Sequence, residues 1–163
     1  MVKLTTNFGD ITLELNAEKA PITVANFLQY VENGFYDGMI FHRVINGFMI
    51  QGGGFDANMK QKKTIAEIKN EADNGLGNDM YSIAMARTSI PDSASSQFFI
   101  NVGDNDFLNH SAPTSSGWGY CVFGKVIAGM DVIDKIRLVK TTTRKGHQDV
   151  PVENVIIERA SRC

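Results

Sequence analysis

The stretch FHRVINGFMIQGGGF, which spans residues 41–55, places charged and amide side chains inside an apolar run. His42, Arg43 and Gln51 lie among aromatic and aliphatic residues, and three glycines follow. A charge in such a run is costly unless it is paired or used, and bare glycines let another backbone approach closely. The pattern indicates an apolar wall with a few convergent polar groups, which is typical of a binding site for a semi-polar ligand. The alternative is a surface Arg43 whose stem covers apolar neighbours and a hydrogen-bonded core histidine at His42.

Three further stretches join this one: SIAMA at 82–86, SQFFI at 96–100 and VFGKV at 122–126. In this order and spacing, they and the run from Phe41 to Gly53 resemble the cyclophilins, the peptidyl-prolyl isomerases. The likeness covers nearly the whole chain. Asn46 stands where that family usually has proline, and Gly54 where it usually has aspartate; neither position is expected to touch substrate.

The composition is that of an ordinary globular protein. The 163 residues are 43% hydrophobic and 21% charged, so we expect one domain over residues 1–163 with a sizeable core. The formal net charge of −2 argues against a nucleic-acid or anionic-membrane partner, both of which require a basic face. The cluster Lys60, Lys62 and Lys63 is predicted to be a solvated loop. No apolar segment approaches the ~20 residues that span a bilayer.

The N-terminal run MVKLTTNFGDITLEL alternates like a strand and lacks the features of a signal peptide. If no leader has been removed, a cytoplasmic location is expected. Cys121 lies in a strand-like run and Cys163 is the last residue, so both are expected to be free thiols. A monomer is the default expectation for a closed barrel with no obvious apolar surface patch.

Hydrophobic periodicity predicts a chain of many strands and two helices. Helices are expected from Pro21 to Gly34 and from Gly129 to Val139. Strand patterns occupy residues 2–15 (a hairpin), 81–86, 97–102, 120–126 and 150–158, with long polar loops at 56–79 and 103–119. The absence of regular β-α alternation disfavours a doubly wound sheet. The pattern alone leaves a barrel or a sandwich; the resemblance implies a mostly β fold, a closed eight-stranded antiparallel β-barrel capped by two α-helices.

Three motifs suggest other chemistry and are rejected. The run from Gly119 to Lys125 has phosphate-loop spacing, but Val126 stands where Ser or Thr would bind magnesium, and strand formers fill the interior. Asn109 begins a glycosylation sequon, which matters only in a secreted chain. Asp104, Asp106, His110 and Ser111 share one polar loop with no further ligand cluster or nucleophile elbow, so a solvated loop is predicted there. No metal and no cofactor are expected.

The reaction implied by the resemblance is rotation about X-Pro bonds. Its barrier of ~18–20 kcal/mol comes from lost amide resonance. Since no bond breaks, a catalyst needs neither a nucleophile nor a general base. It needs a fixed donor near the prolyl nitrogen and an apolar pocket for the ring. Arg43 suits the donor role because its guanidinium stays charged and forked.

The resemblance also implies roles for particular residues. The expected catalytic group consists of Arg43, Gln51, His42 and Phe99. Gln51 is expected to orient Arg43 and His42 to border the site. Phe99 is expected to form the floor of the proline pocket. The residues expected to bind substrate are Phe48, Met49, Leu108, Gln97, Ala84, Met85, Ala86, Phe107 and Tyr120. Ala84 and Ala86 match the peptide-binding edge strand, with Met85 in place of the family's usual asparagine. Phe107 replaces the family's common tryptophan and Tyr120 its histidine, so cyclosporin is expected to bind weakly because an indole donor is absent.

The expected partners are proline-containing peptides and unfolded or folding proteins. Three other functional classes compete with the isomerase. A proline-binding chaperone or scaffold with incidental catalysis is the main alternative, followed by a barrel that binds a small apolar ligand and by a hydrolase. Arg43, Gln51 and Phe99 together favour the enzyme, because a pure binding module has no need of a charged donor beside its pocket.

Overall fold

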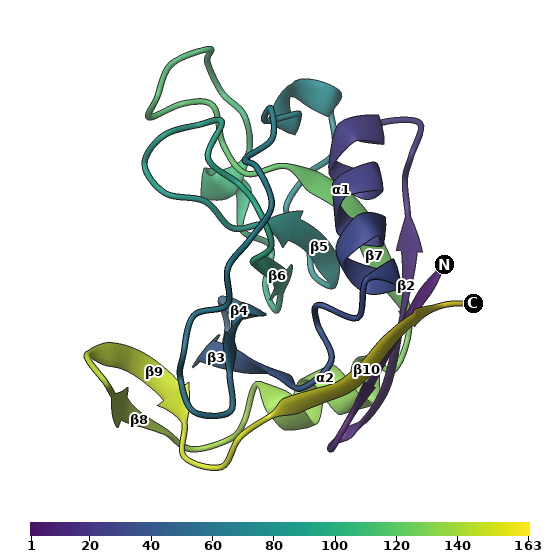
Figure 1. Ribbon diagram of the computed structural model, residues 1–163. Coiled ribbons are helices and arrows are strands. Elements are labelled where there is room, and N and C mark those ends of the chain that lie inside the picture. The colour runs from purple at the N-terminus through teal and green to yellow at the C-terminus, as the bar shows by residue number, and fades with distance from the viewer.

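The computed structural model describes residues 1–163, and eight antiparallel strands close into a barrel (Figure 1). The strands are β1 (Val2–Thr6), β2 (Gly9–Leu15), β3 (Met39–Ile45), β4 (Met49–Asp56), β5 (Ser82–Met85), β6 (Phe98–Asn101), β7 (Val122–Ala128) and β10 (Ile156–Arg162). Around the barrel they run in the order β1-β10-β3-β4-β6-β5-β7-β2. The eight-stranded barrel predicted from the resemblance is confirmed.

Two helices pack on the barrel at separate places, as predicted. Helix α1 (Pro21–Glu32) begins with a proline in its first turn, where a missing amide donor does no harm, and packs against β10. Helix α2 (Met130–Ile136) packs against β2, at the bottom of the view in Figure 1. Neither helix has the length and hydropathy that crossing a bilayer requires.

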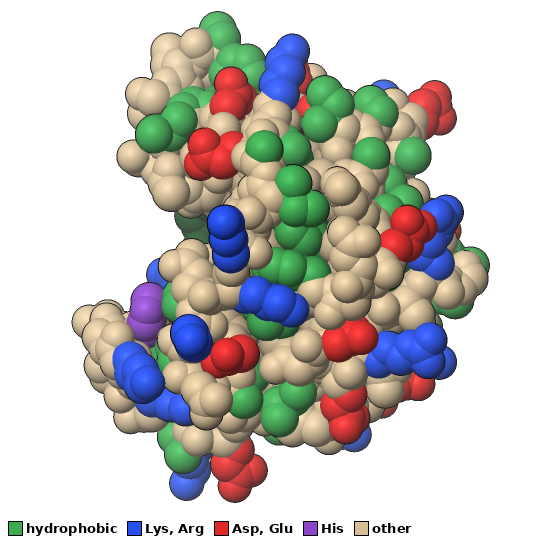
Figure 2. Space-filling model, viewed as in Figure 1, with side chains coloured by type: hydrophobic (Ala, Val, Ile, Leu, Met, Phe, Trp, Pro, Cys, Tyr) green, Lys and Arg blue, Asp and Glu red, His purple; other side chains and the backbone are tan.

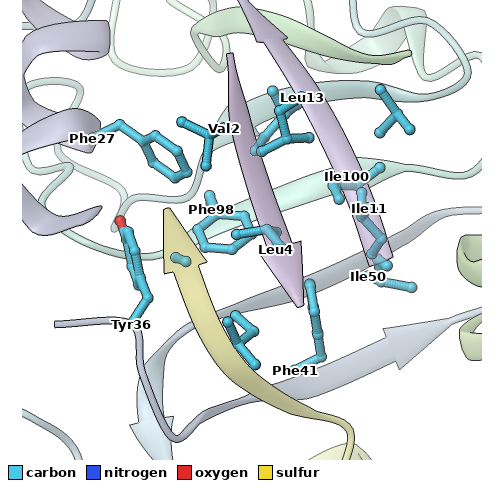
Figure 3. Packing of buried hydrophobic residues seen from close by; sticks show 14 of the residues in the cluster. Val2, Leu4, Ile11, Leu13, Phe27, Tyr36, Phe41, Ile50, Phe98 and Ile100 are labelled. Carbon is cyan, nitrogen blue, oxygen red and sulfur yellow. The ribbon is translucent and has the colours of Figure 1, made fainter. Parts of the chain in front are cut away.

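Aliphatic and aromatic side chains together fill the barrel core (Figure 3). The rings of Phe27 and Tyr36 both meet Phe98 edge-on, with centroids 5.5 Å and 5.4 Å away. This arrangement sets the positive edge of one ring against the negative face of another. The Tyr36 hydroxyl donates a hydrogen bond of 2.7 Å to the carbonyl of Ser96, and so satisfies its one polar group inside the core.

The last predicted strand, 150–158, was only partly right: residues 156–158 lie in β10 (Ile156–Arg162), but residues 152–155 lie in no strand. Val150 belongs to β9 (His147–Pro151), which pairs with β8 (Thr141–Arg144) in a separate hairpin, and β10 begins only at Ile156. The side chain of Val152 is 56% exposed. The apolar residues at 150 and 152 and those at 155 and 157 are out of phase by one position, so no single period-2 strand can bury all of them.

The face drawn in Figure 2 carries lysine and arginine side chains interspersed with acidic ones. It is hollowed on the left, between the loops above and the part of the molecule that carries the β8–β9 hairpin. The three predicted loop lysines, Lys60, Lys62 and Lys63, are exposed. No large field of a single sign covers this face.

Candidate functional site

A pocket of about 150 Å³ opens on the outer surface of the barrel wall, over β3, β4 and β6. It is lined by Arg43, Phe48, Met49, Gln51, Ala86, Arg87, Phe99, Leu108 and Tyr120. Strand alternation explains the outward residues. Ile50 and Ile100 point into the main core, so their neighbours Met49 and Phe99 face the other way.

The apolar wall of the pocket consists of Met49, Phe99 and Leu108, which pack with the buried Ala84 and Val122 in a cluster separate from the main core. Phe99 is only 4% exposed and meets the ring of Tyr120 edge-on at 5.8 Å. Leu108 comes from the short 3₁₀ helix η2 (Asp106–Leu108) in the loop after β6. Phe48 is half-buried and its ring lies 5.7 Å from that of Phe107, which is 73% exposed. The wall is therefore buried, while Phe107 at its margin is exposed to solvent.

The polar rim of the pocket consists of Arg43, Gln51 and Arg87; Gln97, which was expected to bind substrate, does not line the pocket but bonds to Gln51 beside it. Arg43 on β3 lies opposite Gln51 on β4, and the Gln51 Nε2 donates a hydrogen bond of 2.9 Å to the Gln97 Oε1. Arg43 is exposed, and the four salt bridges of the molecule all involve other residues. A guanidinium without a carboxylate partner beside an apolar pocket is free to donate hydrogen bonds to a ligand.

A β-bulge presents Arg43 to the pocket. Phe41 and Val44 both point into the main core, and a regular strand would place only alternate residues on the outer face. Two residues, His42 and Arg43, lie between them because the register of β3 against β4 shifts at this point. Bulges commonly re-aim side chains beside functional sites, and this one turns Arg43 outward.

His42 does not line the pocket. Its ring is 5% exposed and lies 4.5 Å from the ring of Phe55 and 6.3 Å from that of His147, beneath the β8–β9 hairpin. Burial, together with the charges of His147 and Arg43, lowers the pKa of His42 from 6.5 to about 4. The Nδ1 atom is buried without a hydrogen-bond partner. His42 is therefore neutral at pH 7.

The expectation that Ala84 and Ala86 lie on an edge strand was wrong. Strand β5 lies between β6 and β7, and the Met85 amide donates to the Cys121 carbonyl at 3.0 Å. The Met85 side chain is 2% exposed and packs in the main core, so it does not reach the pocket. Ala84 is fully buried and packs with the wall residues without lining the pocket, whereas Ala86 lines the pocket just beyond the end of β5.

Arg87 was missed by sequence reasoning. Its Cζ lies 4.5 Å from the centroid of the Tyr120 ring, and its Nε donates a hydrogen bond of 3.0 Å to the carbonyl of Gly119. A guanidinium over an aromatic face gains a cation–π attraction, which fixes its position. The only signal in the sequence was the placement of Arg87 directly after the SIAMA motif.

The loop at 103–119 is less solvated than predicted. Its carboxylates Asp104 and Asp106 are exposed, but Asn105 is 5% exposed and its Nδ2 donates to the carbonyl of Phe48 and the Oδ1 of Asn101, both at 2.8 Å. These bonds fasten the loop beside β4 and β6. Nothing in the residue pattern distinguished this buried asparagine from its solvated neighbours.

The other motifs that the sequence suggested, a metal site and a phosphate loop, do not form binding sites in the structure. No three His, Cys, Asp or Glu side chains gather closely enough to hold a metal ion. The residues from Val122 to Lys125 lie within β7, so the phosphate-loop spacing belongs to a strand, as the sequence indicated. Cys121 is buried and Cys163 exposed, and both are free thiols.

Comparison with known proteins gives a consistent result. The family described as cyclophilin type peptidyl-prolyl cis-trans isomerase/CLD matches residues 1–162. The chain is 63% identical over 159 residues to peptidyl-prolyl cis-trans isomerase cyp18 of Streptomyces antibioticus, covering 98% of this chain and 96% of that protein. It is 61% identical over 158 residues to peptidyl-prolyl cis-trans isomerase B of Escherichia coli K12, covering 97% and 96%.

Solved structures agree. A Cryptosporidium parvum cyclophilin type peptidyl-prolyl cis-trans isomerase, crystallised in the presence of the dipeptide Ala-Pro, superposes with a TM-score of 0.80 at 28% identity. The match covers 98% of this chain and 96% of that one. The cyclophilin AquaCyp293 from Hirschia baltica shares the fold, with a TM-score of 0.76 at 23% identity over 98% of this chain and 72% of that one.

Proposed function

The chain belongs to the cyclophilin-type peptidyl-prolyl cis-trans isomerase family and is a peptidyl-prolyl cis-trans isomerase; we propose that its pocket holds the proline ring while the Arg43 guanidinium stabilises the twisted amide. The observation that carries this proposal is an unpaired guanidinium at the margin of a buried apolar wall. The proposal divides the work between two parts of one site, the apolar wall and the polar rim.

The chemistry requires that division. In the planar amide the prolyl nitrogen shares its lone pair with the carbonyl, which produces the barrier of ~18–20 kcal/mol. At the top of the barrier the bond is twisted, and the nitrogen regains a localised lone pair that can accept a hydrogen bond. A donor that reaches the nitrogen only in this state lowers the barrier without tightening the binding of the ground state.

Arg43 is the proposed donor. Acceleration to the millisecond range corresponds to roughly 10⁵-fold, or about 7 kcal/mol of barrier. A preorganised charged donor in a site with little water supplies about 3–4 kcal/mol of this. The remainder would come from selective binding of the twisted amide by the apolar wall. Gln51 lies across from Arg43 and is itself held by Gln97 at 2.9 Å, which supports a role in orienting the guanidinium and the substrate backbone.

The apolar wall is the proposed seat of the proline ring. Phe99, Met49 and Leu108 are all less than 10% exposed, so the surface they offer is rigid. If the ring is held there, the acyl group before it can rotate in the open part of the pocket, next to Arg43. Phe48 and Tyr120 line the sides of the pocket and limit its width.

Substrates are proposed to be proline-containing peptides and unfolded or folding proteins. The Ala-Pro dipeptide used with the Cryptosporidium relative supports this class. Weak cyclosporin binding, a monomeric state and a cytoplasmic location remain predictions from the sequence. Gel filtration with light scattering, and fractionation of cells that produce the protein, would test the last two.

The experiment that tests the proposal is cis-trans exchange of a short Ala-Pro peptide, followed by NMR with catalytic amounts of wild type or Arg43→Ala. We expect fast exchange with the wild type and at least a tenfold loss in the variant. No acceleration by the wild type would leave a proline-binding module and refute the enzyme. Equal acceleration by both proteins would place the chemistry away from Arg43.

A further inference from the structure

At each of the three consecutive glycines of β4 a different part of the structure stands in the way of a side chain. A Cβ at Gly52 would lie 2.9 Å from the carbonyl oxygen of Ile40. Gly53 has a φ of +86°, and a Cβ there would lie 2.9 Å from both the Ser96 carbonyl and the Phe98 ring. Backbone and core therefore exclude a side chain at these two positions, which makes both glycines requirements of the fold.

Gly54 is different. Its φ lies outside the left-handed region, so the backbone itself would accept an alanine. The nearest atoms to a Cβ at Gly54 all belong to the side chain of Gln97, with Nε2 at 2.5 Å and both Cδ and Cγ at 2.6 Å. Real Cβ atoms essentially never approach other atoms so closely, so in this chain the side chain of Gln97 occupies the space that a Cβ at position 54 would need.

In that position the Gln97 side chain reaches the polar rim. Its Oε1 accepts the hydrogen bond of 2.9 Å from the Gln51 Nε2, and Gln51 lies opposite Arg43 across the β3–β4 ladder. The main chain of Gln97 is fixed separately, because its carbonyl accepts a hydrogen bond of 3.0 Å from the Ala86 amide. A Cβ at position 54 would thus displace the side chain of Gln97 and leave its backbone in place.

We infer that Gly54 is a positioning residue of the isomerase: its missing side chain leaves the space in which Gln97 lies, and Gln97 there holds Gln51 beside Arg43. The inference rests on the proposed role of Arg43 and Gln51 and extends it to a residue that does not touch substrate. It also predicts that a side chain at position 54 would change the isomerase rate only by displacing the side chain of Gln97.

The test is a double-mutant cycle of Gly54→Ala and Gln97→Ala, with peptide exchange and the free energy of unfolding measured for all four proteins. We expect Gly54→Ala to lower kcat/KM about fivefold, mainly through kcat, and Gln97→Ala to lower it by a similar factor. The double variant should be no slower than Gln97→Ala, because the added Cβ then has no side chain to displace. A double variant slowed by the product of the two single effects would overturn the inference.

Two comparisons separate this inference from its alternatives. We expect any loss of stability caused by Gly54→Ala to disappear in the double variant. If Gly54 served packing alone, Gly54→Ala would destabilise the fold equally with and without the Gln97 side chain. That result would overturn the inference. Even if Gly54→Ala fails to fold, Gln97→Ala tests whether Gln97 positions Gln51 for catalysis. An unchanged kcat in Gln97→Ala would overturn the inference. The wild type and Arg43→Ala, run in the same assay, report on the proposed function. An active wild type with an equally active Gly54→Ala refutes only the present inference.

Discussion

The apolar wall and the polar rim of the pocket come from neighbouring strands but are held in different ways. Wall residues such as Phe99 are buried and packed on several sides. Rim residues are exposed or half-buried: Gln51 is held by its hydrogen bond with Gln97 and Arg87 by its contacts with Gly119 and Tyr120, whereas the Arg43 guanidinium is unpaired. Substitution in the wall should therefore reduce stability and binding together. Substitution in the rim should reduce the rate and leave stability nearly unchanged.

The largest expected effect is that of Phe99→Ala on stability. Truncating this ring, which is 4% exposed, leaves a cavity and should reduce the free energy of unfolding by about 3–5 kcal/mol while raising KM. Chemical denaturation and exchange kinetics measure the two effects. The matched control is Phe107→Ala, whose ring is 73% exposed and whose loss should change stability by about 0.5 kcal/mol or less. Equal losses of stability in the two variants would remove the distinction between the wall and its margin.

Next in size is the pH dependence that comes from His42, which lies outside both the wall and the rim. Its pKa is about 4 in the folded protein and should be about 6.5 when unfolded, so the unfolded chain binds more protons between these values. Stability should fall as the pH is lowered from about 6.5 to 4, by ~3 kcal/mol in total from this group. Urea unfolding at several pH values measures the slope. His42→Leu should flatten the slope, and an unaltered slope would contradict the assignment.

A smaller effect is expected for Arg87→Ala. The change removes the cation–π contact with Tyr120 and should lower kcat/KM about threefold, with a loss of stability of about 1 kcal/mol or less. Arg162→Ala is the matched control, since that arginine forms an exposed ion pair with Glu32 on another part of the barrel. If the two variants have the same exchange kinetics, Arg87 does not belong to the functional rim.

The smallest effect on stability is expected for Phe107→Trp, which adds an indole donor at the exposed margin. Stability should change by about 0.5 kcal/mol or less, while inhibition by cyclosporin should become stronger. Titration of the exchange activity with cyclosporin compares the two proteins. Nanomolar inhibition of the wild type would contradict the prediction that the missing indole weakens binding.

Local alternation alone left a barrel or a sandwich, and the motifs that carry the family resemblance supplied the barrel and most of the wall. Met49, Phe99 and Leu108 were expected in one pocket, and the structure brings them together. The β8–β9 hairpin was missed because its strand TTTR is polar and exposed, and so lacks the pattern by which a strand is recognised.

The residues Arg43, Gln51 and Gln97 were expected at the site, but their placement was harder to predict because it depends on irregularities and long-range contacts. Strict alternation would place His42 and Arg43 on opposite faces of β3, and only the bulge explains why both lie outside the core. The burial of Asn105 depends on the carbonyl of Phe48, which is 57 residues away in the chain. Contacts at such separations leave no periodic trace in the sequence.

The central claim is that the wall binds and Arg43 lowers the barrier. The most direct test measures, for the wild type and Arg43→Ala, both the dissociation constant of an Ala-Pro peptide and the interconversion rate of the bound peptide by NMR at saturating enzyme. We predict dissociation constants that agree within about threefold and a bound rate at least tenfold lower in the variant. Equal bound rates with a weakened dissociation constant would contradict the claim, because Arg43 would then act in binding alone.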